Sequence, residues 1–372
     1  MNRMSRDERY MARALELARL GEGRTRPNPA VGAVIVRDGE VVGEGYHPQA
    51  GEPHAEIFAL RQAGVKAHGA ELFVTLEPCT HHGRTGPCAE AVLAAGIRRV
   101  CIGAVDPNPR VAGRGVARLQ ECGVEVCVGI LDDECRRLIA PFAKHITTGL
   151  PFVVLKSAMT LDGRTATVAG DSRWITGTDS RSWVHQLRDR MDAVMVGIGT
   201  LLRDDPLLTT RLPEGGRDAA RIIVDSRLRI PDTAAIFGVD STAPTIIATT
   251  SAAPADKIAR LEARGAQVIV AADGEGGVDL RDLLRRLGAS GIQSILLEGG
   301  NILNASALQA GLIDRAMVFI APLLLGSGEA PGIFAGRGPE RLADALRLSG
   351  VRVRRFGDDT LIEGEVGGCS PD

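Results

Sequence analysis

The chain has 372 residues, of which 44% are hydrophobic, and its formal net charge at pH 7 is −2. This length exceeds what a single hydrophobic core usually organises, so we expect two domains. The balanced charge excludes a dominant electrostatic attraction to nucleic acid or to an anionic membrane surface, and it favours a small-molecule substrate.

The start of the chain predicts no export or membrane insertion. Its first twenty residues interleave charged and apolar side chains, which is typical of an amphipathic surface helix and not of a signal peptide. No apolar run reaches the roughly 18 residues that span a bilayer. We therefore expect a cytoplasmic protein whose seven cysteines are metal ligands or buried residues before they are disulfides.

The first half alternates predicted helices and strands. Helices are expected at residues 11–20, from about 53, at 87–95 and at 115–122. Strands are expected at residues 30–37, 41–46, 71–75, 99–104 and 124–128. Gly64, Gly96 and Gly123 fall where helices should end in left-handed caps. With a short helix over 138–149, this pattern predicts an α/β/α layered domain.

The second half begins a new alternation at Pro151. Strands are expected at residues 152–157, 193–196, 221–225, 245–249, 267–270, 294–298 and 315–320. Such apolar runs are typical of an open, largely parallel sheet covered on both faces. We place the boundary near residues 147–151, giving domains of residues 1–148 and 149–372. Residues 213–218 and the glycine-rich stretch 273–278 are expected to be surface loops.

Three segments of the first half carry the residue types of a metal site: Pro53-His54-Ala55-Glu56, Pro78-Cys79 and Pro87-Cys88. Because proline suits the first turn of a helix, His54 and Cys88 are expected at helix starts, where unpaired amides favour a thiolate. One imidazole and two thiolates give zinc three ligands and leave a fourth position for water. That is the arrangement of a catalytic zinc site.

Glu56 follows the histidine ligand by two residues and is expected to act beside the metal without binding it. Its carboxylate would take a proton from the activated water and deliver it to the ring nitrogen and the departing amine, which is hydrolytic deamination. The pattern of His-x-Glu and two cysteines is that of zinc-dependent deaminases, but eight residues instead of two separate Cys79 from Cys88. The other cysteines are expected to be buried or inert. His47, His68, His145 and His185 are expected to be solvated or core residues.

The segment from Thr75 to Cys88, Thr-Leu-Glu-Pro-Cys-Thr-His-His-Gly-Arg-Thr-Gly-Pro-Cys, resembles the deaminase domain of the RibD family of bifunctional riboflavin biosynthesis proteins. Residues 25–32, Thr-Arg-Pro-Asn-Pro-Ala-Val-Gly, extend the resemblance. It implies a cytidine-deaminase-like fold in which Asn28 hydrogen-bonds the pyrimidine ring. It also implies that His81, His82 and Arg84 help to hold the ribose phosphate, for which arginine offers paired donors.

In the second half, an apolar strand runs into Gly299-Gly300-Asn301 and a helical segment from Ile302 to Gln309. Glycines at this point let backbone amides approach a phosphate at the helix start, but a tight strand-to-helix turn explains them equally well. The turn lacks the Gly-x-Gly-x-x-Gly fingerprint of a standard dinucleotide-binding fold.

Six ordered segments of this half resemble the RibD reductase domain, which has a dihydrofolate-reductase-like fold: residues 152–164, 171–176, 197–200, 204–211, 224–226 and 294–301. The resemblance implies an NADPH site lined by Ala158, Trp174, Thr200, Asp204, Ser226, Gly300, Asn301, Ile302, Leu303, Asn304, Ala305 and Ser306. It implies a substrate site formed by Lys156, Ser172, Arg188, Leu208, Arg211 and Glu298. The arginines suit a phosphate, Trp174 suits a planar ring, and Lys156 suits the sugar carbonyl.

These features predict a bifunctional α/β enzyme, expected to be a homo-oligomer. It would deaminate 2,5-diamino-6-(5-phosphoribosylamino)pyrimidin-4-one with zinc, then reduce 5-amino-6-(5-phosphoribosylamino)uracil with NADPH. Two alternatives remain: a nucleoside or RNA-base deaminase with a non-catalytic nucleotide-binding domain, and a zinc-stabilised binding module. An aromatic content of only 3% disfavours RNA recognition.

Overall fold

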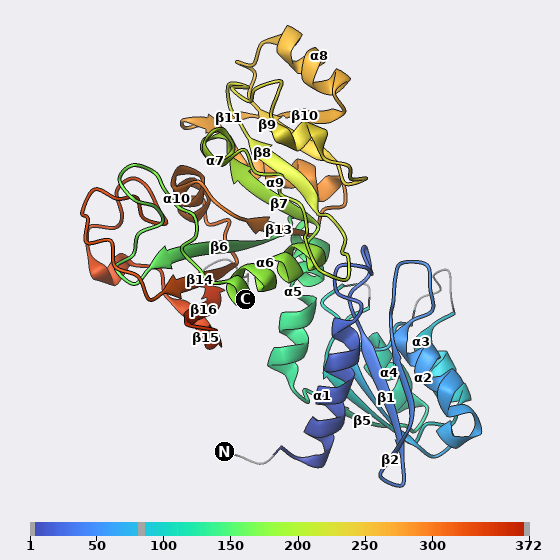
Figure 1. The fold of residues 1–372 in the computed structure, drawn as a ribbon. Helices are drawn as coiled ribbons and strands as arrows, with labels where there is room; N and C mark the ends of the chain where they lie inside the picture. Colours follow the sequence, from blue (N-terminus) through green and yellow to red (C-terminus); the bar gives the residue numbers. More distant parts are fainter. Residues whose placement is uncertain (1–3, 81–85, 110, 368–372) are drawn as a thin grey trace. The chain divides into compact units, whose positions relative to one another are not determined.

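The computed structural model describes residues 4–80, 86–109 and 111–367. The chain divides into two compact units, Met1–Gly149 and Leu150–Asp372, each with its own sheet (Figure 1). Among the described residues, every helix is too short or too polar to cross a bilayer.

The first unit is built on a five-stranded sheet in the order β2-β1-β3-β4-β5. Its strands are β1 (Gly32–Arg37), β2 (Glu40–Tyr46), β3 (Glu71–Leu76), β4 (Arg99–Ala104) and β5 (Glu125–Val128). β1 pairs antiparallel with β2 and β3, whereas β3, β4 and β5 run parallel. The parallel strands therefore present their carboxyl ends at one edge, where the loops that carry chemistry begin.

Helices cover both faces of this sheet because both sets of alternating side chains are apolar. Ala33 and Ile35 of β1 pack with α2 (Ala55–Ala63), α3 (Cys88–Ala94) and α4 (Arg114–Glu121). Val34 and Val36 pack on the other face with α1 (Arg6–Arg19) and α5 (Asp132–Thr148). A 3₁₀ turn, η1 (Gly64–Ala67), follows α2. The predicted glycine caps at Gly64, Gly96 and Gly123 all have positive φ, but Gly64, with a ψ of −132°, is not in the left-handed helical conformation.

The second unit contains a nine-stranded sheet in the order β10-β9-β8-β7-β13-β6-β14-β16-β15. The strands from β10 to β14 in this order are parallel, and β16 and β15 are antiparallel. They are β6 (Phe152–Thr160), β7 (Ala193–Gly197), β8 (Ala220–Val224), β9 (Thr245–Thr249), β10 (Ala266–Val270), β13 (Ser294–Leu297), β14 (Arg315–Ala321), β15 (Leu348–Phe356) and β16 (Asp359–Val366).

Nearly every residue of β7, β8, β9 and β13 is buried, as expected for parallel strands covered on both faces. Leucines of α9 (Leu280–Ala289) and of α10 (Asn301–Gln309) pack on one face. The remaining helices of the unit are α6 (Thr178–Arg190), α7 (Ile198–Asp204), α8 (Ala255–Ala263), η2 (Ala235–Gly238) and η3 (Leu342–Asp344).

Two sequence expectations are wrong in detail, and the strands β15 and β16 were not predicted at all. The short helix expected over residues 138–149 is the 17-residue α5, which begins in an acidic first turn favoured by the helix dipole and contains Pro141. The strand β15 was not predicted, because its almost fully exposed residues mix valine with arginine and glycine. The expected loop 273–278 contains a two-stranded ladder of β11 (Asp273–Gly274) and β12 (Gly277–Val278).

Candidate active sites

In the first unit, local chain geometry brings three metal-ligating side chains together. His54 is the N-cap residue of α2 and Cys88 begins α3, as predicted from the prolines before them. Cys79 lies three residues beyond the end of β3. Both helices therefore direct the positive ends of their dipoles toward the cluster, which favours thiolate ligands.

The donor set and its spacing fit a zinc ion. The ligand atoms of His54, Cys79 and Cys88 all lie within 4.8 Å of one another. The His54 Nδ1 atom is 3.2 Å from the Cys88 Sγ and 3.6 Å from the Cys79 Sγ. Tetrahedral zinc with ordinary Zn–N and Zn–S bonds separates its ligands by about 3.6 Å. One imidazole and two thiols with this spacing are thus suited to zinc, with room for one more ligand.

The two thiols influence each other's ionisation. Hydrogen bonds from Cys88 and His54 lower the pKa of Cys79 to about 4, against the effect of burial. The interaction with Cys79 and burial both raise the pKa of Cys88. A second thiolate is unfavourable beside the first unless a cation neutralises the pair, and a divalent metal is such a cation.

Glu56 lies in the first turn of α2 and is only 3% exposed. Burial raises its pKa to about 6. Within the described structure its Oε2 atom is buried without a hydrogen-bond partner. A buried polar atom of this kind requires an absent water, ion or ligand. Glu56 is thus a proton acceptor of nearly neutral pKa beside the metal ligands, suited to general acid–base work.

His47, which the sequence left as a solvated or core residue, lies at this site. It is 2% exposed and its ring centroid is 5.3 Å from that of His54. Its Nδ1 atom is 3.0 Å from the Pro53 carbonyl, which can only accept, so Nδ1 carries the proton. Burial lowers the pKa of His47. The neutral Nε2 then accepts from the Asn28 Nδ2 at 3.1 Å, which orients the Asn28 amide.

The buried Glu77 also escaped the sequence analysis. Its carboxylate accepts hydrogen bonds of 2.7 to 3.1 Å from the backbone amides of Asp106, Gly113, Gly115 and Val116. These bonds attach Glu77, two residues before Cys79, to the loop before α4 and to the first turn of α4. His81, His82 and Arg84 lie outside the described residues.

In the second unit, predicted cofactor residues meet at the carboxyl ends of β7, β8 and β13. Gly299 and Gly300 both have positive φ, and the Gly197 amide donates to the Gly299 carbonyl at 3.3 Å. A Cβ atom added at Gly300 would lie 3.4 Å from the Thr200 Oγ1. The turn thus presents bare backbone at the start of α10, as the approach of a phosphate requires.

The remaining predicted cofactor residues differ in what they can offer. Trp174 is 66% exposed with the Arg181 guanidinium 4.7 Å from its ring, so it is no core residue. Asp204 ends α7, and the Ser226 Oγ accepts from the Val278 amide. Within α10, Leu303 is a core residue, and the side-chain amide of Asn304 donates to the Ile333 carbonyl. The other predicted residues of this helix are partly buried (Asn301 and Ala305) or exposed (Ile302 and Ser306). In α10, therefore, backbone amides of the first turn are the suitable phosphate ligands.

A buried charge cluster forms the centre of the predicted substrate site. Glu298 follows β13 and lies beside Lys156 of the neighbouring β6, whose Nζ is 3.8 Å away. The Arg188 side chain donates to both Glu298 oxygens at 2.5 and 2.9 Å. Burial opposes ionisation of Glu298, but the charges of Arg188 and Lys156 outweigh it and lower its pKa. Burial lowers the pKa of Lys156 although Glu298 opposes this. Ala158 lies on the same face of β6 as Lys156.

His185 is a second residue whose place the sequence did not reveal. Burial and the charges of Arg188 and Arg211 lower its pKa to about 4, so it is neutral near pH 7. Its Nδ1 accepts from the Arg211 backbone amide at 3.2 Å.

The other residues predicted to bind the substrate differ in exposure. The Arg211 side chain is exposed, whereas Leu208 is buried with a φ of 54°. Ser172 is partly buried, in the loop before α6.

The metal cluster leads to a first prediction. We expect purified protein to contain about one zinc ion per chain, because three ligands with tetrahedral spacing suffice for a catalytic site. The double variant Cys79→Ala/Cys88→Ala should lose the metal in elemental analysis. The matched double variant Cys101→Ala/Cys135→Ala removes two buried cysteines outside the cluster and should retain it. Full zinc content in the first variant would place the ligands elsewhere.

Models of known protein families match both units of the chain. The model of the cytidine and deoxycytidylate deaminase zinc-binding region matches residues 4–104, and that of the RibD C-terminal domain matches residues 151–362. The riboflavin biosynthesis protein RibD of Aquifex aeolicus is 43% identical over 96% of this chain and 97% of its own.

Two solved structures extend the similarity over the full length. Acinetobacter baumannii RibD is 40% identical with a TM-score of 0.83, and a Thermotoga maritima diaminohydroxyphosphoribosylaminopyrimidine deaminase/5-amino-6-(5-phosphoribosylamino)uracil reductase is 36% identical with a TM-score of 0.82. Each covers 97% of this chain and 99% of its own. The chain therefore belongs to the RibD family, as a bifunctional enzyme of riboflavin biosynthesis that joins a zinc-dependent deaminase to an NADPH-dependent reductase.

Proposed function

We propose that the first domain deaminates 2,5-diamino-6-(5-phosphoribosylamino)pyrimidin-4-one and that the second reduces the resulting 5-amino-6-(5-phosphoribosylamino)uracil. The observation that carries this proposal is the pairing of a His54/Cys79/Cys88 cluster, beside buried Glu56, with a separate glycine turn and charge cluster in the other unit. The activities named for the Thermotoga maritima protein support these substrates. We place the domain boundary after residue 148.

In the deaminase domain, His54, Cys79 and Cys88 would hold the zinc ion. When bound, zinc supplies a Lewis acid that makes water nucleophilic near neutral pH. Glu56 then carries a proton from the attacking water to the ring nitrogen and to the departing amine. Asn28, oriented by the neutral His47, hydrogen-bonds the pyrimidine. We assign the binding of the ribose phosphate to His81 and Arg84, because a guanidinium offers paired donors to phosphate oxygens.

In the reductase domain, the turn at Gly300 and the first amides of α10 would hold a phosphate of NADPH. Ala158, Thr200, Asp204 and Ser226 line the same edge of the sheet. Trp174 offers its exposed ring as an apolar wall. NADPH, when bound, supplies the hydride. Side chains of the reductase domain position the sugar that accepts this hydride.

Around that sugar, Glu298 opposes the effect of burial on the pKa of Lys156 and places the Lys156 Nζ for hydrogen bonding to the carbonyl oxygen. Arg188 already donates to Glu298 and to the Thr209 carbonyl, so we assign it to holding Glu298. The exposed Arg211 is then the phosphate ligand. Its backbone amide donates to the His185 Nδ1, and this hydrogen bond holds the backbone of Arg211 in place. Ser172 and Leu208 complete the substrate site.

Incubation with the diaminopyrimidinone tests the whole proposal. Without NADPH we expect ammonia and the deaminated pyrimidine with its ribosyl chain intact. With NADPH we expect the ribityl product and stoichiometric oxidation of the cofactor. Ammonia release from cytidine or RNA, but not from this substrate, would contradict the proposal and favour the alternative of a nucleoside or RNA-base deaminase.

The substitution Gly300→Val separates the two activities. Valine disfavours the φ of +87° at this turn, and its side chain would crowd Thr200. The free variant should relax from this turn, so binding has to restore a backbone conformation that costs about 1–3 kcal/mol. We therefore expect the dissociation constant of NADPH to rise by about tenfold or more. Ammonia release should stay near that of the wild type. Gly338→Val, at a position with open space and no positive φ, is the control. Equal loss of both activities in folded Gly300→Val would argue against the assignment.

We also propose that the chain forms a homo-oligomer through β15. This edge strand exposes Val351 by 52% and Val353 by 62%, and exposed apolar edges favour pairing with another chain. Light scattering should give at least twice the mass of one chain. Val351→Lys/Val353→Lys should reduce this mass to that of a monomer. A monomeric wild-type protein would contradict the proposal.

A further inference from the structure

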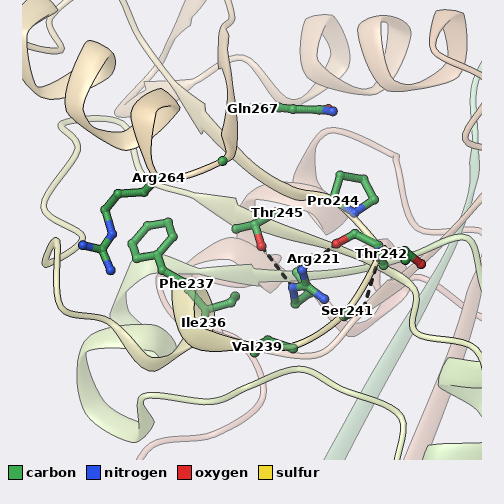
Figure 2. A pocket seen from close by; sticks show the side chains of 12 residues that line it. Arg221, Ile236, Phe237, Val239, Ser241, Thr242, Pro244, Thr245, Arg264 and Gln267 are labelled. Carbon is green, nitrogen blue, oxygen red and sulfur yellow. Dashed lines mark hydrogen bonds between the residues drawn. The ribbon is translucent and has the colours of Figure 1, made fainter.

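A cavity of about 350 Å³ opens in the second unit at the beginning of three neighbouring parallel strands (Figure 2). Arg221 is the second residue of β8, Thr245 is the first of β9 and Gln267 is the second of β10. The turn η2 and the loop after it complete the wall, with Arg264 from the end of α8.

This cavity is separate from the cofactor and substrate site. The residues proposed to bind NADPH follow the carboxyl ends of β7, β8 and β13, whereas the cavity lies at the amino ends of β8, β9 and β10. A five-residue parallel strand such as β8 spans about 16 Å between these edges. A ligand of the cavity would therefore not compete directly with either known ligand of the domain.

Arg221 is the chemically distinctive residue of the cavity wall. It is 3% exposed, and its guanidinium lies among the lining side chains in Figure 2. Its Nε donates to the Thr245 Oγ1 at 3.0 Å and its Nη2 to the Ala243 carbonyl at 2.5 Å. Within the described structure its Nη1 is buried and has no hydrogen-bond partner. Burial lowers the pKa of Arg221, with Asp218 opposing, but a guanidinium stays charged.

The surroundings of Arg221 add positive charge and little that neutralises it. Arg264 also lines the cavity, with its guanidinium 5.3 Å from the Phe237 ring centroid. No acidic side chain is among the described lining residues. The charge of Asp218 acts on Arg221, but the Asp218 Oδ1 already accepts a hydrogen bond from the Thr210 amide. A buried, incompletely bonded cation in such a setting is stabilised by a bound anion.

We propose that this cavity is a second anion site of the reductase domain, which takes a phosphate group, either free or carried by a small molecule. Arginines bind phosphate oxygens through paired, charge-assisted hydrogen bonds. Arg221 supplies the unused Nη1 donors, and Arg264, beside the Phe237 ring, adds a second positive charge to the wall. The side chains of Thr242 and Gln267 in the wall offer further polar contacts.

Amide hydrogen exchange of the segment 239–245 tests the proposal in the full-length enzyme, because this readout is specific to the cavity. Inorganic phosphate and ribose 5-phosphate serve as probes, and each is titrated into the wild type, Arg264→Gln and Arg221→Met. In the wild type, phosphate should slow exchange in a saturable manner. The half-saturating concentration should rise by about tenfold or more in Arg264→Gln. Arg285→Gln, an exposed arginine of α9 outside the cavity, should behave as the wild type.

Tighter binding of ribose 5-phosphate than of phosphate would identify a phosphorylated small molecule as the ligand class, and equal binding would identify the free anion. Unchanged exchange in the wild type at millimolar concentrations of both probes would overturn the proposal and leave water as the occupant. An unaltered titration in Arg264→Gln would overturn it as well. Because Arg264 is exposed, the Arg264→Gln variant provides the test even if Arg221→Met fails to fold.

Discussion

Replacing Glu56 by glutamine should lower the rate of deamination by about 100- to 10,000-fold, the usual contribution of a positioned acid–base group. Glutamine keeps the shape of glutamate but cannot accept and return a proton. Because Glu56 is not one of the clustered metal ligands, zinc content should remain that of the wild type. The fold should also persist, since one oxygen of the carboxylate is buried without a hydrogen-bond partner in the described structure.

The measurement is ammonia release from the diaminopyrimidinone, combined with elemental analysis of the same preparation. Supplying the deaminated pyrimidine and NADPH should show normal oxidation of the cofactor, because every residue that we assign to the reductase site lies in the second unit. Glu52→Gln is the matched control, an exposed glutamate four residues earlier. Near-normal ammonia release by Glu56→Gln would remove Glu56 from the mechanism.

Replacing Glu298 by alanine should destabilise the reductase domain by about 3–5 kcal/mol, because it leaves Arg188 and Lys156 buried without their shared counter-charge. Reduction should be lost with it, since Lys156 is no longer held in place. Both tryptophans, Trp174 and Trp183, lie in this unit, so their fluorescence during denaturant unfolding reports on it. Ammonia release under native conditions should persist.

Two further variants show whether the buried charge is the cause. Glu340→Ala removes an exposed glutamate of the same unit and should change the free energy of unfolding by less than about 0.5 kcal/mol. Glu298→Gln/Arg188→Met removes one cation together with the carboxylate, and it should recover part of the stability lost in Glu298→Ala. A loss below about 1 kcal/mol in Glu298→Ala would show that the cluster is solvated in the protein.

The sequence by itself determined the features that depend on local chemistry. A proline before His54 and before Cys88 predicts two helix starts, and both occur. The apolar runs of β7, β8, β9 and β13 predict a buried parallel sheet, because strands covered on both faces carry no polar alternation. The pair Gly299-Gly300 predicts a turn that only glycine adopts readily, and both residues have positive φ.

Only the tertiary structure decided which distant groups meet. No local pattern marks His47 as the partner of Asn28, or His185 as the partner of Arg211, because these contacts join separate segments of the chain. The pairing of Arg188 with Glu298 likewise joins residues 110 positions apart in the chain. The incompletely bonded Arg221 is equally invisible in the sequence, where a buried arginine looks like a solvated one. Burial and pairing are properties of the assembled sheet, so they arise only when strands far apart in the chain lie side by side.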